Sequence, residues 1–139
     1  DIALLDNNNP KAIIEVKAFY TFDLIKKNAA DYINEVKKDI DKAKEAANDD
    51  TEIYALLLAT HPHNVPEHSD AIKYYKSIQN MYKSNENEAT HRTNAVNNVS
   101  NLQLNNRINA SGSITCEKAF GVNVDVLWWL YGPFLKNEN

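Results

Sequence analysis

Residues 13–23, IIEVKAFYTFD, decide how this chain folds. Branched and aromatic residues are concentrated here, as in a β-strand that packs into a core. Successive side chains of a strand point to opposite faces, so Glu15 and Lys17 share one face with Ile13. Two opposite charges on one face of so apolar a strand require a physical explanation.

The segments around this strand predict a β-β-α-β unit. Residues 1–6 form a short apolar segment, and the turn-forming run NNNP joins it to the strand at 12–22 as a hairpin. From Asp23 onward apolar residues recur every three or four positions, which predicts an amphipathic helix over 23–47. The continuous apolar run at 51–60 is typical of a central strand, so the helix is a crossover between parallel strands. We expect this helix to pack on the sheet through four branched residues: Ile25, Ile33, Val36 and Ile40.

The second half of the chain continues the α/β pattern. A proline-containing loop at 61–70 ends at Asp70, which is expected to cap a helix that contains Ile72, Tyr75, Ile78 and Tyr82. Residues 84–109 have weak helical periodicity. Residues 111–120 resemble a strand, and 122–132 are either a strand or a buried helix. The order predicts an α/β layered domain with a mixed sheet.

Length and composition limit the class of protein. A chain of 139 residues predicts a single domain, 1–139, and 43% apolar with 24% charged residues is ordinary for a globular protein. The net charge of −4 argues against non-specific coating of DNA or a membrane, so nucleic-acid contact would need a local basic patch. No stretch approaches the ~18 apolar residues of a membrane span. The single cysteine, Cys116, favours a reducing, cytoplasmic location, and we expect it in the core.

Folding the hairpin through its asparagine turn brings an acid beside Glu15. With Asp6 opposite Pro10, Asp1 lies opposite Glu15, and the Cβ atoms of opposed residues are about 5 Å apart. A register slip of one residue would remove this pairing. Two carboxylates so close repel each other unless one is protonated or a cation lies between them. Hard oxygen ligands on a rigid strand pair suit Mg²⁺ or Mn²⁺, so Asp1 and Glu15 are candidate metal ligands.

Lys17 admits two interpretations. Beside a metal-bound water, its ammonium would orient or deprotonate the water and stabilise negative charge on phosphorus, which suits phosphodiester hydrolysis. Alternatively, Glu-x-Lys is common on exposed strand faces, where the two charges form a weak surface pair. The apolar flanks, the acid opposite Glu15 and the crossover that follows favour the catalytic interpretation.

The order of these features resembles a known family. An aspartate opening DIALLD, a turn, IIEVKAFYTF, a long helix and IYALLLAT resemble the core of the PD-(D/E)xK nucleases, the restriction-endonuclease-like superfamily. The resemblance covers about residues 1–60 and implies a mixed central sheet flanked by helices. It implies that Asp1 and Glu15 hold the metal together with the carbonyl of Val16, and that Lys17 is the catalytic lysine. The family core usually begins with a helix and a strand before the aspartate, so we expect this sequence to lack both.

Other side chains are candidates for contact with the substrate. Lys26 and Lys27 lie on the outer face of the predicted helix, where a solvated face with i,i+4 pairs is the alternative. His61 and His63 follow the third predicted strand, and crevices of α/β sheets form at strand ends, so both are candidates for contact with phosphate. His-x-His can also bind zinc, although no second ligand pair stands at a familiar spacing.

The sequence therefore predicts a cytoplasmic, Mg²⁺-dependent nuclease that hydrolyses DNA. One rival is a non-enzymatic interaction module of the same fold. A second is an unrelated α/β binding protein in which Glu15 and Lys17 form a structural pair. Aromatic residues near the C-terminus belong either to the core or to a homodimer interface: Trp128, Trp129, Tyr131 and Phe134.

Overall fold

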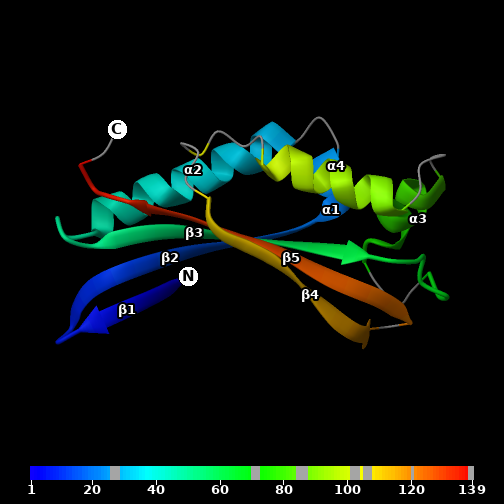
Figure 1. Ribbon diagram of the computed structural model, residues 1–139, viewed down its shortest axis with the longest axis horizontal. Helices are drawn as coiled ribbons and strands as arrows, with labels where there is room; N and C mark the ends of the chain where they lie inside the picture. The colour runs from blue at the N-terminus through cyan, green and yellow to red at the C-terminus, as the bar shows by residue number, and fades with distance from the viewer. Residues whose placement is uncertain are drawn as a thin grey trace.

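In the part of the chain that the structure describes, a mixed five-stranded sheet carries helices on one face, as Figure 1 shows. The computed structural model describes residues 1–25, 29–69, 73–83, 88–100, 104, 108–119 and 121–137. The elements in chain order are β1 (Ile2–Asp6), β2 (Asn9–Tyr20), α1 (Thr21–Ile25), α2 (Ala29–Ala46), β3 (Glu52–Pro62), α3 (Tyr75–Lys83), α4 (Glu88–Ser100), β4 (Ile108–Ala119) and β5 (Val122–Phe134).

The sheet has the strand order β1-β2-β3-β5-β4, and β2 and β3 are parallel while the other neighbours are antiparallel. The predicted β-β-α-β arrangement is therefore confirmed. The hairpin turns through two asparagines with φ values of 48° and 66°, a conformation that asparagine tolerates and that matches the twist of a hairpin.

The register of the hairpin agrees with the prediction at one end only. Ile2 pairs with Ile14, the register in which Asp1 falls opposite Glu15. The predicted pairing of Asp6 with Pro10 is wrong, because Lys11 of β2 is skipped between the pairs Leu4–Ala12 and Leu5–Pro10, which shifts the register by one residue toward the turn.

The predicted helix over 23–47 is described as two helices, α1 and α2. Val36 and Ile40 of α2 are buried against the sheet, and Ile33 packs against the same core, as predicted. The side chain of Ile25 lies outside the described part of the chain. The amphipathic pattern thus identifies correctly which face of α2 is buried.

The first helix begins at Thr21, two residues earlier than predicted, because Asp23 caps the N-terminus of the helix. The carboxylate of Asp23 accepts a hydrogen bond from the backbone N–H of Tyr20 at 3.1 Å. This is the arrangement in which an acid in the first turn satisfies the amide just before the helix.

One face of the sheet carries the core. Alternate residues of β3 that face the helices are almost completely buried, and α2 and α4 cover them together with the facing residues of β5. Tyr131 links the sheet to the helix layer, since its hydroxyl donates a hydrogen bond from β5 to the carbonyl of Val99 in α4 at 3.1 Å. Burial raises the pKa of Tyr131 to about 12.

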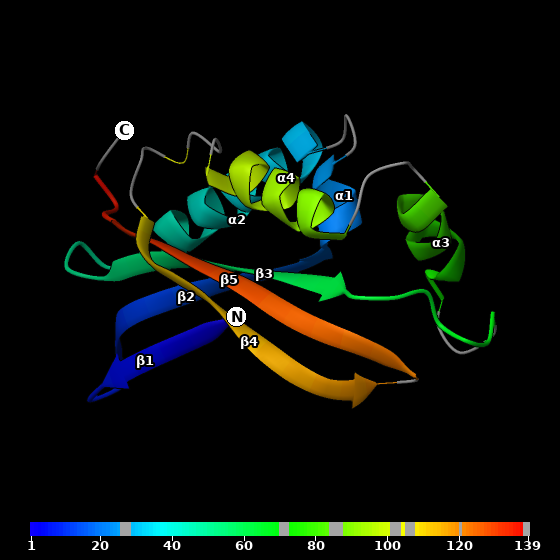
Figure 2. The ribbon, with the colours of Figure 1, turned by 45° about the vertical axis from the view of Figure 1, so that its right-hand side comes forward.

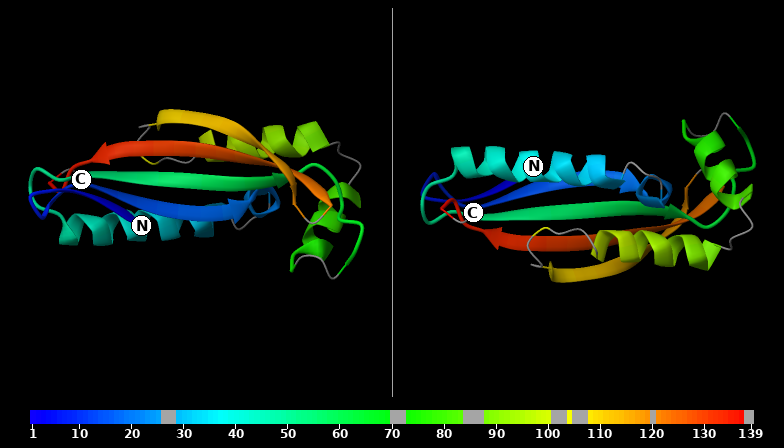
Figure 3. Two further views of the ribbon diagram at one scale, coloured as in Figure 1. Left: turned by 90° about the horizontal axis from the view of Figure 1, so that it is seen from below. Right: turned by 90° about the horizontal axis from the view of Figure 1, so that it is seen from above.

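The other face of the sheet is not covered by any helix of the described part of the chain, as Figures 2 and 3 show. Side chains on this face and along the edges include Ile2, Leu4 and Ile114, which are 49%, 54% and 58% exposed. The predicted mixed sheet is thus present, but its described helices cover one face instead of flanking both.

The C-terminal half resolves one alternative and corrects one prediction. The third helix begins at Tyr75, and Asp70 and Ile72 lie outside the described residues. The segment 122–132 is a strand, not a helix, because it pairs with neighbours on both sides. Cys116 is partly exposed on the edge strand β4 and is not a core residue.

The aromatic residues near the C-terminus divide between the two faces of the sheet. Trp129, Tyr131 and Phe134 are buried, whereas Trp128 belongs to the uncovered face. Among the described helices none is both long and apolar enough to cross a membrane.

Candidate functional site

The Glu-x-Lys segment lies on the covered face of β2. Glu15 and Lys17 pair in register with Ala55 and Leu57 of β3, which are 1% and 0% exposed. Both charged side chains are themselves only partly exposed. The two charges therefore lie at the edge of the core, where the effective dielectric constant is lower than in water.

The ammonium of Lys17 is fixed by an acid from α2. Its Nζ donates to Oδ2 of Asp39 at 2.8 Å, and the two side chains are 30% and 25% exposed. Lys42 approaches the other oxygen of Asp39 at 3.7 Å. The hydrogen bond from Lys17 lowers the pKa of Asp39 against the opposing effect of burial. The partner of Lys17 is thus Asp39 and not Glu15, the partner that the structural interpretation of the sequence proposed.

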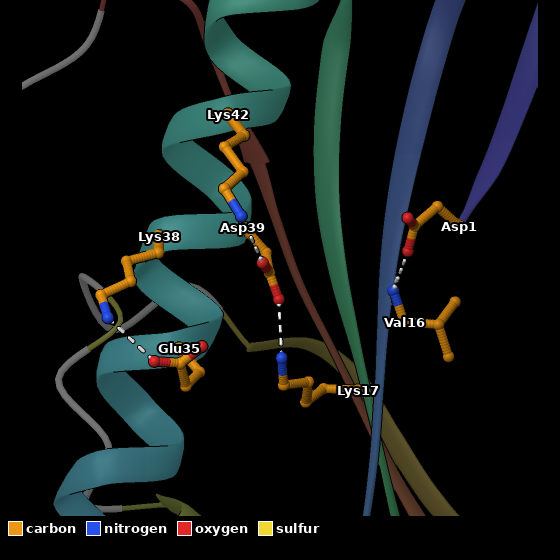
Figure 4. A network of polar contacts seen from close by, with 7 residues as sticks. All are labelled: Asp1, Val16, Lys17, Glu35, Lys38, Asp39 and Lys42. Carbon is orange, nitrogen blue, oxygen red and sulfur yellow. Dashed lines mark hydrogen bonds and ion pairs between the residues drawn. The ribbon is translucent and has the colours of Figure 1, made fainter.

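Asp1 reaches β2 at the residue between the two charges. The backbone N–H of Val16 donates to Oδ1 of Asp1 at 3.5 Å. In Figure 4 Lys17 points toward α2, whereas Asp1 lies on the other side of β2, beside Val16. The structure thus brings the Asp1 carboxylate to the Glu-x-Lys strand but directs the lysine away from it.

The described residues contain no group of three or more His, Cys, Asp and Glu side chains arranged to hold a metal ion. The expected metal ligands include only two carboxylate side chains, Asp1 and Glu15, because the third donor is the backbone carbonyl of Val16. They are therefore fewer than the three side chains of such a group. The predicted substrate contacts Lys26 and Lys27 lie outside the described residues.

The two histidines after β3 have different surroundings. His61 is 0% exposed, and its Nδ1 lies 2.9 Å from the hydroxyl of Thr21. A buried ring of this kind does not meet a phosphate in solvent. His63 is partly exposed, and its Nε2 lies 3.2 Å from Oδ1 of Asp125. The two rings meet edge-on with centroids 5.3 Å apart.

Asp125 is the centre of a second polar cluster, at the end of the sheet where β3 finishes. Its side chain is 8% exposed and lies 3.4 Å from the guanidinium of Arg92 in α4. Burial would raise the pKa of Asp125, but hydrogen bonds from His63 and Thr115 and the charge of Arg92 outweigh it and lower the pKa. The cluster joins α4 to the sheet, since its members come from α4, β4, β5 and the loop after β3.

Asp39 and Asp125 are residues that sequence reasoning missed, although each leaves a signal. Asp39 stands one turn after Val36 and beside Ile40, so it lies within the apolar stripe of the helix. Asp125 is the single charge in VNVDVLWWL. An acid inside an apolar pattern indicates a partner from another element, because a buried charge is costly unless it is paired.

No protein-family model, no curated protein and no solved structure matches the chain.

Proposed function

We propose that the chain is a metal-dependent nuclease of the restriction-endonuclease-like type that hydrolyses phosphodiester bonds in DNA. One observation carries the proposal: the register of β1 on β2 brings the Asp1 carboxylate within 3.5 Å of the amide nitrogen of Val16, between Glu15 and Lys17. The helical crossover and the parallel strand β3 follow in the order that the resemblance implies.

Each residue has a chemical role in this proposal. Asp1, Glu15 and the carbonyl of Val16 are the hard oxygen donors that Mg²⁺ prefers. When bound, such an ion supplies an activated water and neutralises charge at the phosphate. Lys17 supplies a fixed positive charge for the negative charge that builds up on phosphorus.

Asp39 acts through Lys17 in this scheme and is a positioning residue. Its hydrogen bond holds the lysine ammonium at 2.8 Å in a partly buried place. A held ammonium loses less freedom when the substrate arrives than a solvated one.

DNA would have to approach a protein of net charge −4 through a local basic surface. The exposed side of α2 carries lysines close to the Glu-x-Lys strand, of which Lys38 and Lys42 are 65% and 76% exposed. Phosphate contacts of this kind weaken steeply as salt rises. The proposed activity should therefore fall with increasing ionic strength.

Plasmid cleavage in Mg²⁺ tests the proposal directly. Glu15→Gln and Lys17→Met should each lower the cleavage rate by about 10²–10³ or more while the protein stays folded. The matched control is Lys11→Met, since Lys11 also lies on β2 and pairs with an aspartate, Asp50, at 3.1 Å. Cleavage that is undetectable in the wild type, or that all three variants retain, would refute the nuclease.

The uncovered sheet face supports a second candidate, a non-catalytic module that assembles as a homodimer. Monomers rarely expose a large contiguous apolar patch, and such patches mark interaction surfaces. Leu4 and Ile114, at 54% and 58% exposure, lie on strands at opposite edges of the sheet. Light scattering after size exclusion should then give twice the monomer mass, and a monomer at high concentration would refute this candidate.

A further inference from the structure

An aromatic cleft lies at the end of β2, beyond the part of the strand that β1 pairs with. Its cavity measures about 400 Å³, within the roughly 300–1,000 Å³ of small-molecule sites. Five separate parts of the chain line it: Phe19 and Tyr20 from β2, Asp23 from α1, Tyr32 from α2, Thr60 from β3 and Tyr74 from the turn before α3.

The rings of the cleft are held by one another. Tyr20 stacks on Phe22 with centroids 4.8 Å apart and planes 10° apart, so Phe22 supports it. Tyr74 meets Tyr20 at 5.0 Å and a tilt of 55°, and it is 39% exposed. The cleft thus combines a supported ring with an outer ring open to solvent, which suits a planar aromatic ligand.

The carboxylate of Asp23 gives the cleft a preference for ligands that donate hydrogen bonds. The Tyr20 amide donates to Asp23 and so fixes the carboxylate beside the rings. Burial first and then the charge of Asp23 raise the pKa of Tyr32, which also lines the cleft. A carboxylate accepts hydrogen bonds from exocyclic amino groups of bases. It also repels phosphate, so the phosphate of a nucleotide would remain outside.

A positive charge lies beside Tyr74, the exposed ring of the cleft. The ammonium of Lys73 stands 5.3 Å from the centroid of the Tyr74 ring. A lysine there attracts a phosphodiester backbone while the rings receive the base.

The cleft adjoins the Glu-x-Lys segment. Phe19 follows Lys17 by two residues on the same face of β2, roughly 7 Å along the strand. That spacing is about twice the ~3.4 Å axial rise per nucleotide of a stacked DNA strand, and an unstacked, extended strand covers it in one nucleotide. A base in the cleft would therefore belong to the nucleotide next to a phosphodiester at Lys17.

We infer that this cleft binds one unstacked nucleobase that carries an exocyclic amino group, so that the substrate is single-stranded or locally unpaired. The inference rests on the proposed nuclease function for its link to cleavage, while binding itself is measured separately. Cytosine, adenine and guanine carry such an amino group, and thymine does not.

Anisotropy of labelled oligo-dC and oligo-dT in EDTA measures binding without cleavage. Tyr74→Ala should weaken oligo-dC binding about 5- to 150-fold, as expected for the loss of one stacked base. Tyr74→Phe should restore the affinity, because it keeps the ring. Asp23→Asn should remove the preference for oligo-dC while melting near the wild type. The control is Tyr54→Ala, since Tyr54 lies near the other end of β3, where its hydroxyl donates to Glu52.

Several outcomes would overturn the inference. Equal oligo-dC affinity for wild type and Tyr74→Ala would do so, as would wild-type binding of oligo-dT as tight as that of oligo-dC. Displacement of the oligomer by tetramethylammonium chloride, but not by sodium chloride at equal ionic strength, would identify an organic-cation site instead.

The two proposals fail in distinguishable ways. If the wild type binds oligo-dC through Tyr74 but cuts no DNA, the nuclease fails and the base site stands. If it cuts duplex and single strands equally, and Tyr74→Ala changes neither rate nor affinity, the base site fails and the nuclease stands.

Discussion

Breaking the Lys17–Asp39 pair is the perturbation that separates structure from catalysis. Two unit charges 4 Å apart attract by about 4 kcal/mol at an effective dielectric constant of 20. Exposed pairs retain about 0.2–1 kcal/mol of this, whereas breaking a buried pair costs about 3–5 kcal/mol. With side chains 30% and 25% exposed, we expect a coupling energy between these limits, about 1–2 kcal/mol.

The assay is a double-mutant cycle by urea unfolding of wild type, Lys17→Met, Asp39→Asn and the double variant. In a separate thermal scan, each single variant should have a melting temperature roughly 3–8 °C below that of the wild type. Because the pKa of Asp39 is lowered in the folded state, its stabilisation is complete above the pKa of the unfolded chain. That stabilisation is lost as pH falls through the folded pKa, so the coupling should vanish in acid.

Coupling below about 0.3 kcal/mol at neutral pH would refute the reasoning, because it would mean that the pair adds nothing measurable. The matched control is the Lys11–Asp50 pair, whose side chains are 51% and 72% exposed. It should couple by less than about 0.5 kcal/mol. In the nuclease, Asp39→Asn keeps the lysine and should retain far more cleavage than Lys17→Met.

Three further changes have definite expected outcomes. Mg²⁺ should raise the melting temperature of the wild type, since a ligand that binds only the folded state stabilises it, and Glu15→Gln should abolish the rise in a thermal scan. Gly132→Ala should lower the unfolding free energy by more than about 1 kcal/mol, because φ is +122° and a Cβ would lie 2.7 Å from the carbonyl oxygen of Ile53; wild-type stability in urea would contradict this. Leu4→Lys should shift any dimer to monomer in light scattering, and an unchanged mass would exclude this part of the uncovered face from the interface.

Local pattern determines the first half of the fold. The alternation in IIEVKAFYTFD places Glu15 and Lys17 on one face, and the asparagine turn brings Asp1 to the same strand. The period of 3.6 identifies the buried face of α2 through Val36 and Ile40. These features depend on residues close together in the sequence, and side-chain periodicity reports them directly.

The sequence alone left the second half of the chain ambiguous. The segment 122–132 is apolar almost throughout, which fits a strand and a buried helix equally well. Pairing with β3 and β4 decides for the strand. Which of Trp128 and Trp129 is buried follows only from the position of α2 and α4 on one face of the sheet.

The partners of the charged residues were decided by tertiary structure alone. Lys17 meets Asp39 from 22 residues away, and His63 meets Asp125 across two strands. Each acid stands out in its own segment as a charge within an apolar pattern, but the pattern does not name the side chain that neutralises it. The partner of each acid depends on how the crossover helix packs against the sheet and where the last strand pairs within it. A partly buried charge is stabilised by whichever opposite charge this packing brings within about 3–4 Å.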